Sequence, residues 1–399
     1  MATATGGWPA CTYKEIPWQQ QVRAGTKEDR MVRSIKISIP PKIAKQAFAL
    51  SSDLIAKSES AIKAIANLDN AYGQMLKPLE RLLTRTESIA SSKIENLFAT
   101  SEEYAQAQYG NKSNSSAVAM VAGTNALVTM IASVDSSKTI TEANIKLAHQ
   151  RLMKDVAREQ DNAGQYRRVQ NWIDGSNHSP LGAIFIPPPP EMVEKLMKDL
   201  LVFANRDDVP ALAQAAITHA QFETIHPFTD GNGRIGRALV NAILRRRTVT
   251  TKVIVPIASS LAANRDGYFE DLNNYRRGHF EHLLIRFADA SILTATEAGT
   301  AAANLADLPV MWKAKLGTVR SGGSTSKLLE FVISNPVFSA EELMGLIGKN
   351  PSGVYRTIAK LQEVGILVPL TSRTRNQIWA AHDVLQELDS LDQRIALHH

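Results

Sequence analysis

A glycine-rich loop between two helical patterns lies at the centre of the sequence. An alanine-rich segment begins at Ala211, and after the loop Ile235, Leu239 and Ile243 recur at four-residue steps, which places them on one helix face. Residues 231–233, Gly-Asn-Gly, are small or tolerant of positive φ, so successive backbone N–H groups can converge on an anion there. The pattern therefore predicts a phosphate-binding loop at the start of a helix.

Charged and ionisable side chains surround this loop. Arg234 and Arg237 lie three residues apart in the first turn of the second helix, from which they can extend bidentate hydrogen bonds toward a polyphosphate. Asp230 supplies the hard oxygen ligand that Mg²⁺ prefers. His226 precedes the loop by a rigid Pro-Phe step, and a neutral imidazole can accept a proton from a hydroxyl group. Taken singly, each feature also has a purely structural explanation, but together they predict attack on a bound nucleotide phosphate.

The stretch from His226 to Arg237 resembles the signature of the Fic family, H-x-F-x-[DE]-G-N-G-R-x-x-R, with every fixed position filled. The resemblance implies a protein adenylyltransferase that uses ATP and Mg²⁺ to place AMP on a Tyr, Ser or Thr hydroxyl of another protein. It implies that His226 is the base, that Asp230 holds Mg²⁺, and that Asn232 with the loop backbone orients the α-phosphate. It also implies that Arg234 and Arg237 hold the terminal phosphates and that pyrophosphate leaves.

Two further segments resemble parts of the same family. Residues 164–169 and 185–191 look like the two ends of a β-hairpin flap that pins the target segment by strand addition in relatives, although a plain surface hairpin is an alternative. Asn264 and Tyr268 lie in a segment that resembles the lining of the nucleotide's base and ribose, and core packing of the aromatic ring competes with that role. The predicted nucleotide-binding residues are therefore Gly231, Asn232, Gly233, Arg234, Arg237, Asn264 and Tyr268.

An upstream segment resembles the family's inhibitory motif, [ST]-x-x-x-E-[GN]. Ser91, Glu95 and Asn96 occupy its fixed positions, and Ser91 and Glu95 lie one helical turn apart, which projects them from the same face. The resemblance implies that Glu95 pairs with Arg237 and takes the place of the ATP γ-phosphate, so that the protein inhibits itself. A Ser and a Glu on a solvated helix face are the structural alternative.

Residues 326–385 resemble a winged helix-turn-helix domain. Apolar spacing predicts helices around 328–333 and 354–361, a capping box joins Ser339 to Glu342 between them, and residues 365–379 are typical of a two-stranded wing. Between residues 349 and 375 a single acid, Glu363, stands against five basic residues: Lys349, Arg356, Lys360, Arg373 and Arg375. This excess favours phosphate contact, but acidic residues surround the stretch, so DNA binding and protein docking both remain open.

We therefore expect a mainly α fold, with an all-helical Fic core, a small β-hairpin flap, an N-terminal helical domain and a C-terminal winged-helix domain. The predicted divisions are an irregular N-terminal arm at 1–40, the domain carrying the inhibitory helix at 41–115, the catalytic core at 116–290, a linker at 291–324 and the winged helix at 325–399. The composition of the linker allows a helix followed by a hinge.

Composition bears on the setting of the protein. The single cysteine, Cys11, excludes a disulfide framework and a Cys-based zinc site. No apolar run approaches the ~20 residues that cross a bilayer, and residues 1–18 lack the features of a signal peptide, so we expect a cytoplasmic protein. The net charge of +6 is too diffuse to indicate a nucleic-acid partner by itself. The resemblance suggests a homodimer.

Three functions fit these observations. The leading one is the self-inhibited AMP transferase. The second is a DNA-binding regulator whose catalytic domain only senses a nucleotide. The third is a related transfer reaction, such as removal of AMP, which the intact Glu95 keeps open.

Overall fold

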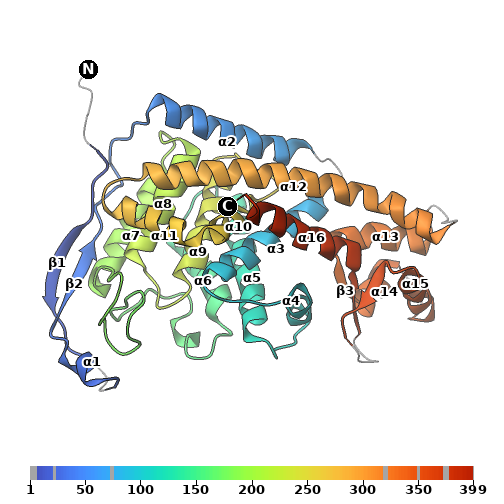
Figure 1. Ribbon diagram of the computed structural model, residues 1–399, viewed down its shortest axis with the longest axis horizontal. Helices are drawn as coiled ribbons and strands as arrows, with labels where there is room; N and C mark the ends of the chain where they lie inside the picture. Colours follow the sequence, from blue (N-terminus) through green and yellow to red (C-terminus); the bar gives the residue numbers. More distant parts are fainter. Residues whose placement is uncertain are drawn as a thin grey trace. The chain divides into compact units, whose positions relative to one another are not determined.

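The computed structural model describes residues 7–20, 24–71, 76–317, 322–347, 351–371 and 377–398, and helices dominate it (Figure 1). Contacts divide the chain into two units, each assembled from several stretches of sequence. The first contains the chain up to Ile62 with Asn125–Val249 and Asn264–Asp289, and the second contains Lys63–Thr124, Thr250–Ala263 and the chain from Ala290 onward. The mainly α fold is confirmed. The predicted domain boundaries do not coincide with these two units.

The first unit has α8 (Ala211–Ile225) at its centre, buried at every residue. A helix that is buried at every residue needs neighbours on all sides, and α8 packs against α7 (Pro190–Ala204), α9 (Asn232–Arg246) and α11 (Arg265–Arg276). The remaining elements are β1 (Thr12–Pro17), α1 (Lys27–Met31), β2 (Ser34–Ile39), the start of α2 (Ser52–Ala71), the end of α5 (Ser115–Ser137), α6 (Glu142–Met153), a 3₁₀ turn (Gln160–Asn162) and the start of α12 (Glu281–Leu316).

The prediction of an irregular arm at residues 1–40 is wrong for most of its described part. Strands β1 and β2 pair antiparallel, from Thr12 opposite Ile39 to Pro17 opposite Ser34, with α1 between them. In β2, buried Ile35 and Ile37 alternate with exposed residues, which is the period of a half-buried strand. Almost all of β1 is exposed, so it shows no such alternation. The sequence therefore has no strand period at β1 from which the strand could be predicted.

The predicted flap hairpin is reduced to one pair of residues. Ile173 and Phe185 form an isolated antiparallel bridge, in which the Ile173 N–H donates to the Phe185 carbonyl at 2.9 Å. The rest of the flap, residues 166–189, follows an irregular path through several turns. Hydrogen bonds other than strand pairing hold this path, such as those from Trp172 Nε1 to the Ser176 carbonyl at 2.7 Å and from the Gln170 side chain to the Pro187 carbonyl at 3.0 Å.

The second unit contains a three-stranded sheet in the order β3-β5-β4, with helices around it. Antiparallel pairing joins β3 to β5 and β5 to β4. The C-terminal elements are α13 (Ser324–Ser334), β3 (Val337–Ser339), α14 (Ala340–Ile347), α15 (Pro351–Glu363), β4 (Leu367–Pro369), β5 (Ile378–Ala381) and α16 (His382–Ala396). The unit also contains α3 (Leu76–Ile94), α4 (Ser101–Gln108) and α10 (Ile257–Ala263).

The C-terminal module shares its hydrophobic core with helices from earlier in the chain. Leu82 of α3 and Ala105 of α4 belong to the same buried cluster as Phe338 and Trp379 of the sheet. Polar contacts join the same elements, since Lys93 of α3 lies 3.0 Å from Asp392 of α16. Helices α3 and α4 and the C-terminal sheet therefore share one hydrophobic core.

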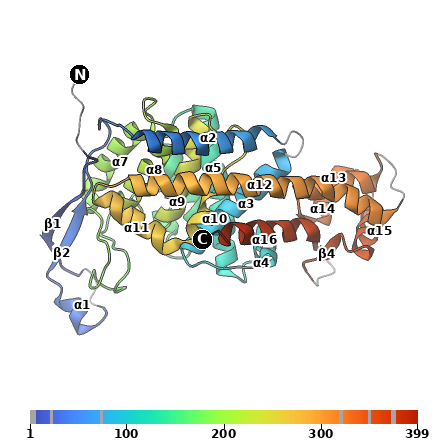
Figure 2. The ribbon, with the colours of Figure 1, turned by 45° about the horizontal axis from the view of Figure 1, so that its top comes forward.

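The predicted linker at residues 291–324 is mostly helix. Helix α12 continues through it to Leu316, as one unbroken ribbon in Figures 1 and 2. Ala298, Leu305 and Trp312 recur at seven-residue steps along it and are at most 1% exposed. The alanine-rich composition suits a helix, and this buried face keeps the helix packed.

Among the described helices, α5 alone is long and apolar enough to cross a membrane by length and composition. Of its most apolar window, 39% is buried inside the protein, and Met120, Leu127 and Met130 are core residues. The expectation that no segment reaches this length was wrong, because Asp135 is the only charged residue between Ser115 and Ser137.

Candidate active site

His226 ends helix α8 in a left-handed conformation, with φ 51° and ψ 61°. Its N–H still donates to the Phe222 carbonyl at 2.8 Å, so the chain turns sharply out of the helix at this residue. Left-handed geometry at a residue other than glycine is held only where its surroundings determine it, and such residues cluster at functional sites. The imidazole is 17% exposed, and its Nδ1 lies 4.0 Å from a carboxylate oxygen of buried Glu223.

Reciprocal hydrogen bonds fix the loop that follows. The Phe228 N–H donates to the Asn232 side-chain oxygen at 2.8 Å, and the Asn232 side-chain N–H donates to the Phe228 carbonyl at 2.8 Å. Phe228 is fully buried. The Asn232 amide, predicted to orient a phosphate, therefore holds the shape of the loop.

His149 supports the same loop, although no motif in the sequence marks it. Its ring stacks on Phe228 with 3.7 Å between centroids. Its Nδ1 accepts from the Gly164 N–H at 2.9 Å, which leaves Nε2 to donate to the Asp230 carbonyl at 3.0 Å. Burial lowers the pKa of His149 to about 4, so the ring is neutral near pH 7. It acts as a fixed spacer between α6 and the loop.

The loop then opens α9 at Gly231, whose φ is 76°. A Cβ atom at Gly231 would lie 2.8 Å from a methyl carbon of Leu152, so both the conformation and the space require glycine. Gly233 follows in the first turn of α9. The N-terminus of the helix thus carries the backbone N–H groups and the partial positive charge that favour an anion.

Two guanidinium groups and one carboxylate flank this helix start. Arg234 and Arg237 are 9% and 2% exposed, so both positive charges are held in a largely water-excluded place. Asp230 is 58% exposed in its side chain, and its carboxylate lies 3.9 Å from the Arg234 guanidinium. No group of three or more His, Cys, Asp or Glu in the described part of the chain could hold a metal alone. The single carboxylate suits Mg²⁺ that arrives with phosphate oxygens as further ligands.

Arg167 joins the base of the flap to the end of α8. Its side chain is 3% exposed and donates to the carbonyls of His226 at 2.8 Å, Val169 at 3.1 Å and Pro188 at 2.5 Å. Burial lowers its pKa to about 10, which leaves the group charged at pH 7. A cation at the carbonyl end of a helix is favourable, so Arg167 stabilises the turn that presents His226.

Gly236 allows α8 and α9 to approach each other closely. A Cβ atom there would lie 3.0 Å from His219 Nδ1 and 3.2 Å from a ring carbon of Phe222, and it would also meet the Glu223 carboxylate. The glycine in the middle of α9 is therefore required by packing.

We expect Gly236→Ala to lower the free energy of unfolding by about 1–3 kcal/mol, because added bulk in a packed core forces neighbouring side chains to move. Chemical denaturation measures the change. Gly345→Ala is the matched control, since Gly345 lies in α14 with open space around it, and alanine in a helix is favoured over glycine by about 0.5–1 kcal/mol. Equal effects of the two substitutions would contradict the packing argument.

The two residues predicted to contact base and ribose occupy different environments. Tyr268 is 1% exposed, and its hydroxyl lies 2.8 Å from His219 Nε2, so it has the packing role that the sequence analysis gave as the alternative. Asn264 is exposed at the start of α11, where its side chain accepts from the Gly267 N–H at 3.1 Å. A nucleotide contact by Asn264 stays a prediction.

The residues predicted to form an inhibitory motif lie at the end of helix α3 in the second unit. Ser91 is buried, and Glu95 follows in the exposed turn after the helix. Asn96 has φ 58°, and the Leu97 N–H donates back to the Ser92 carbonyl at 3.1 Å. The pattern is a Schellman cap, in which the left-handed position favours glycine or asparagine. That preference gives a physical reason for [GN] at the end of the motif.

Comparisons with known proteins place this site in a family. Residues 139–244 match the Fic/DOC family. The chain is similar to the protein adenylyltransferase Fic of Nematostella vectensis, at 33% identity over 148 residues, which is 36% of this chain and 31% of that protein. A probable protein adenylyltransferase of Aquifex aeolicus is 47% identical over 64 residues, which is 16% of this chain and 20% of that protein. The chain thus spans less than a third of the length of these curated relatives.

Solved structures share the fold at lower identity. A Fic family protein from Desulfovibrio desulfuricans has a TM-score of 0.55 and 20% identity, and the match covers 84% of this chain and 97% of that one. A Fic-domain signalling protein from Bacteroides thetaiotaomicron has a TM-score of 0.51 and 19% identity, covering 62% and 97% of the two chains. These likenesses concern the fold alone.

Proposed function

Because this chain belongs to the Fic/DOC family, with the family domain at residues 139–244, we propose that it is a protein adenylyltransferase. The reaction would move AMP from ATP to a Tyr, Ser or Thr hydroxyl of another protein. The observation that supports this most is the loop from His226 to Arg237, where an imidazole ends one helix and two buried guanidinium groups begin the next.

The start of α9 would hold the nucleotide. Its backbone N–H groups and helix dipole attract phosphate, and Arg234 and Arg237 add two charges that little water screens. Asp230 is the residue that would hold Mg²⁺, which neutralises phosphate charge when it binds with ATP. Because these groups are already fixed, they need little reorganisation during the reaction.

His226 would carry the proton transfer. Its imidazole accepts the proton of the acceptor hydroxyl while the hydroxyl oxygen forms a bond to the α-phosphorus. The bond between the α-phosphorus and the oxygen that joins it to the β-phosphorus breaks. AMP is then attached to the acceptor, and pyrophosphate leaves. Glu223, 4.0 Å behind the ring, favours the positive charge that the imidazole gains.

The deciding experiment incubates the protein with cell lysate, Mg²⁺ and ATP labelled either at the α-phosphate or at the γ-phosphate. Protein-bound label from α-labelled ATP alone supports AMP transfer. Label from γ-labelled ATP would mean phosphate transfer and would contradict the proposal. Release of AMP from a modified protein, without any addition, would favour the alternative in which water removes the AMP by hydrolysis.

We expect Arg167→Lys to lower kcat by about tenfold to a hundredfold while the Kd for ATP changes little. Lysine keeps the charge but loses the planar fork that reaches several carbonyls at once, and small displacements of a reacting group are costly. Single-turnover kinetics and nucleotide titration separate the two quantities. Arg168→Lys is the control, because Arg168 is exposed, and an equal loss there would contradict the role of Arg167.

We also propose that Ser91, Glu95 and Asn96 restrain the enzyme, on the strength of their motif. The carboxylate of Glu95 would compete with the γ-phosphate, so that ATP binds in a reactive position only when the restraint is released. The cap at Asn96 gives Glu95 a defined place at the end of α3.

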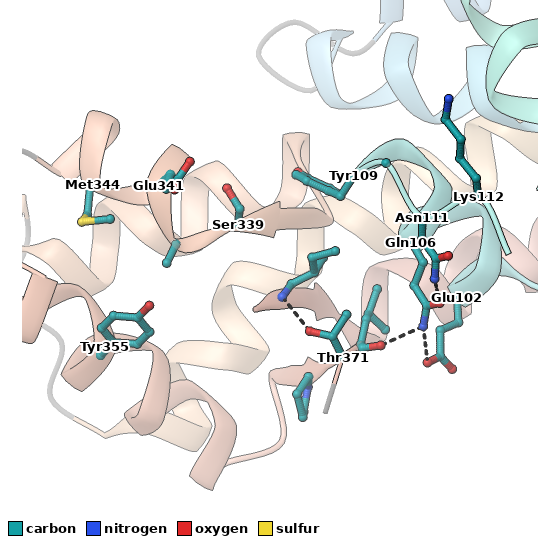
Figure 3. Close-up of a pocket in the computed structure, with 15 residues that line it drawn as sticks. Glu102, Gln106, Tyr109, Asn111, Lys112, Ser339, Glu341, Met344, Tyr355 and Thr371 are labelled. Atoms are coloured by element: carbon teal, nitrogen blue, oxygen red, sulfur yellow. Dashed lines mark hydrogen bonds between the residues drawn. The ribbon is translucent and has the colours of Figure 1, made fainter. Parts of the chain in front are cut away.

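The winged-helix module is proposed to dock a protein segment. A groove of about 1000 Å³ separates α4 from the module, and Glu102, Lys112, Glu341 and Tyr355 are among its lining residues (Figure 3). This mixed charge suits a protein surface better than the uniformly negative DNA backbone. Of the five basic residues predicted for phosphate contact, Arg356 and Lys360 are exposed on α15, and the other three lie outside the described residues. A DNA affinity that falls steeply with salt would overturn this choice. The predicted homodimer and cytoplasmic setting belong to the same proposal.

A further inference from the structure

The tip of the flap is held by the N-terminal segment, far from it in sequence. The Ser179 hydroxyl donates to the Asp29 carboxylate at 2.6 Å, and Ser179 is fully buried. The Gln20 side chain donates to the His178 carbonyl at 2.9 Å. Gly25, with φ 76°, comes so near that a Cβ atom there would lie 2.8 Å from the Cβ of His178. The contact is tight enough to define where the tip lies.

Helix α1 aims Asp29 at the flap. The Thr26 N–H donates to the Asp29 carboxylate at 2.8 Å, and the Asp29 N–H donates to the Thr26 hydroxyl at 3.3 Å, which completes a capping box. Hydrogen bonds from Ser176, Ser179 and Thr26 hold the pKa of Asp29 well below its usual range. The carboxylate therefore stays ionised and accepts from both the helix start and the flap.

Two more contacts extend along the flap toward its base. The Trp18 ring packs edge-on against Trp172 with 5.8 Å between centroids. The Ser38 N–H of β2 donates to the Ile186 carbonyl at 2.8 Å. The arm, defined as β1, α1, β2 and the described residues between them, thus touches the flap at its tip, middle and end.

The opposite side of the flap is fixed to the catalytic loop. The Asn171 side chain donates to the Phe228 carbonyl at 3.0 Å, and Arg167 donates to the His226 carbonyl at 2.8 Å. Only one strand-like bridge pairs the two sides of the flap, so the contacts with the arm on one side and with the loop on the other help to fix its position.

We infer that the arm is a positioning element for the acceptor protein and that the acceptor docks across arm and flap together. This inference rests on the proposed function, since it concerns the substrate of the same site. Exposed apolar side chains lie on both parts, with Tyr13 at 52% and Ile184 at 69%.

Charge indicates the kind of acceptor that fits. In the described arm, two acidic side chains, Glu15 and Glu28, are exposed against five basic ones: Lys14, Lys27, Arg30, Arg33 and Lys36. The surface therefore fits an acceptor that is acidic next to its hydroxyl residue, and its binding weakens as salt rises.

The test compares Asp29→Ala with Glu28→Ala, both in the Glu95→Gly protein. Each substitution removes one carboxylate from the first turn of α1, but only Asp29 contacts the flap. In Asp29→Ala we expect amide exchange over residues 173–185 to become about tenfold faster, because a charged hydrogen-bond acceptor is lost. Labelling of lysate proteins by α-labelled ATP falls by about tenfold, while the Kd of a fluorescent ATP analogue changes less than about twofold. Glu28→Ala leaves the exchange rate and the nucleotide affinity unchanged and does not lower labelling, because it removes an exposed negative charge from a surface that is proposed to bind an acidic acceptor.

The side-chain oxygen of Asp29→Asn still accepts hydrogen bonds. In this variant we expect most of the protection from amide exchange and most of the labelling to be retained. Unchanged exchange and labelling in Asp29→Ala would overturn the inference, as would an equal loss of nucleotide affinity, which would mean general unfolding. If labelling does not change with salt concentration, the inference that the acceptor is acidic next to its hydroxyl residue is wrong. If the Glu95→Gly protein labels nothing, the proposed function fails, and the exchange measurement still decides whether the arm holds the flap.

Discussion

Replacing His226 with asparagine is expected to lower AMP transfer by about 10²–10⁴-fold, the usual contribution of a general base. Asparagine tolerates the left-handed conformation of residue 226, so the turn after α8 survives while the proton acceptor is lost. The buried arginines at the start of α9 remain, and nucleotide binding should persist. Rates of α-label incorporation and titration with an ATP analogue measure the two properties.

His226→Ala tests the same role with a different backbone preference. Alanine is less tolerant of φ 51°, so some stability should be lost in addition to activity. Equal loss of activity in the two variants, with different thermal stability, identifies the imidazole as the cause. Wild-type activity in His226→Asn would exclude His226 as the base.

Replacing Glu95 with glycine is expected to raise AMP transfer by about tenfold or more. A restraint that leaves about one molecule in ten competent lowers apparent ATP affinity by the same factor, and removing it restores that factor. The gain should therefore appear mainly as a lower KM for ATP. Initial rates over a range of ATP concentrations measure it.

Asn96→Gly is the matched control for Glu95→Gly. Glycine adopts the left-handed conformation of residue 96 without strain, so the cap of α3 and the Glu95 carboxylate both remain. Activity should stay at the parent level. A rise equal to that of Glu95→Gly would mean that loosening the helix end, rather than losing the carboxylate, activates the protein.

The catalytic loop was predictable from sequence because its parts are contiguous. Twelve positions contain the imidazole, the carboxylate, the helix start and both arginines, so local geometry brings them together. The supporting residues were not predictable in this way. His149 contacts the loop across 81 residues of chain, and Arg167 contacts His226 across 59. Without tertiary structure, a lone histidine or arginine carries no signal of its partner.

A nucleotide contact by Tyr268 stays a prediction, because sequence cannot separate an aromatic ring that lines a pocket from one that packs beneath it. The arm lacked a visible strand period because β1 is exposed on both faces. The linker agrees with its composition, which allowed a helix followed by a hinge, because α12 continues to Leu316 and its small residues pack along one side.

The core that Leu82 shares with Phe338 and Trp379 limits how the protein can be dissected. A truncation before Ser324 would uncover the apolar side of α3 and remove the partner of Lys93. A truncated chain that gains activity would thus reveal little about what the winged helix recognises, since the deletion would itself melt or displace the segment carrying Glu95. Point substitutions on the surface of the module are the cleaner route.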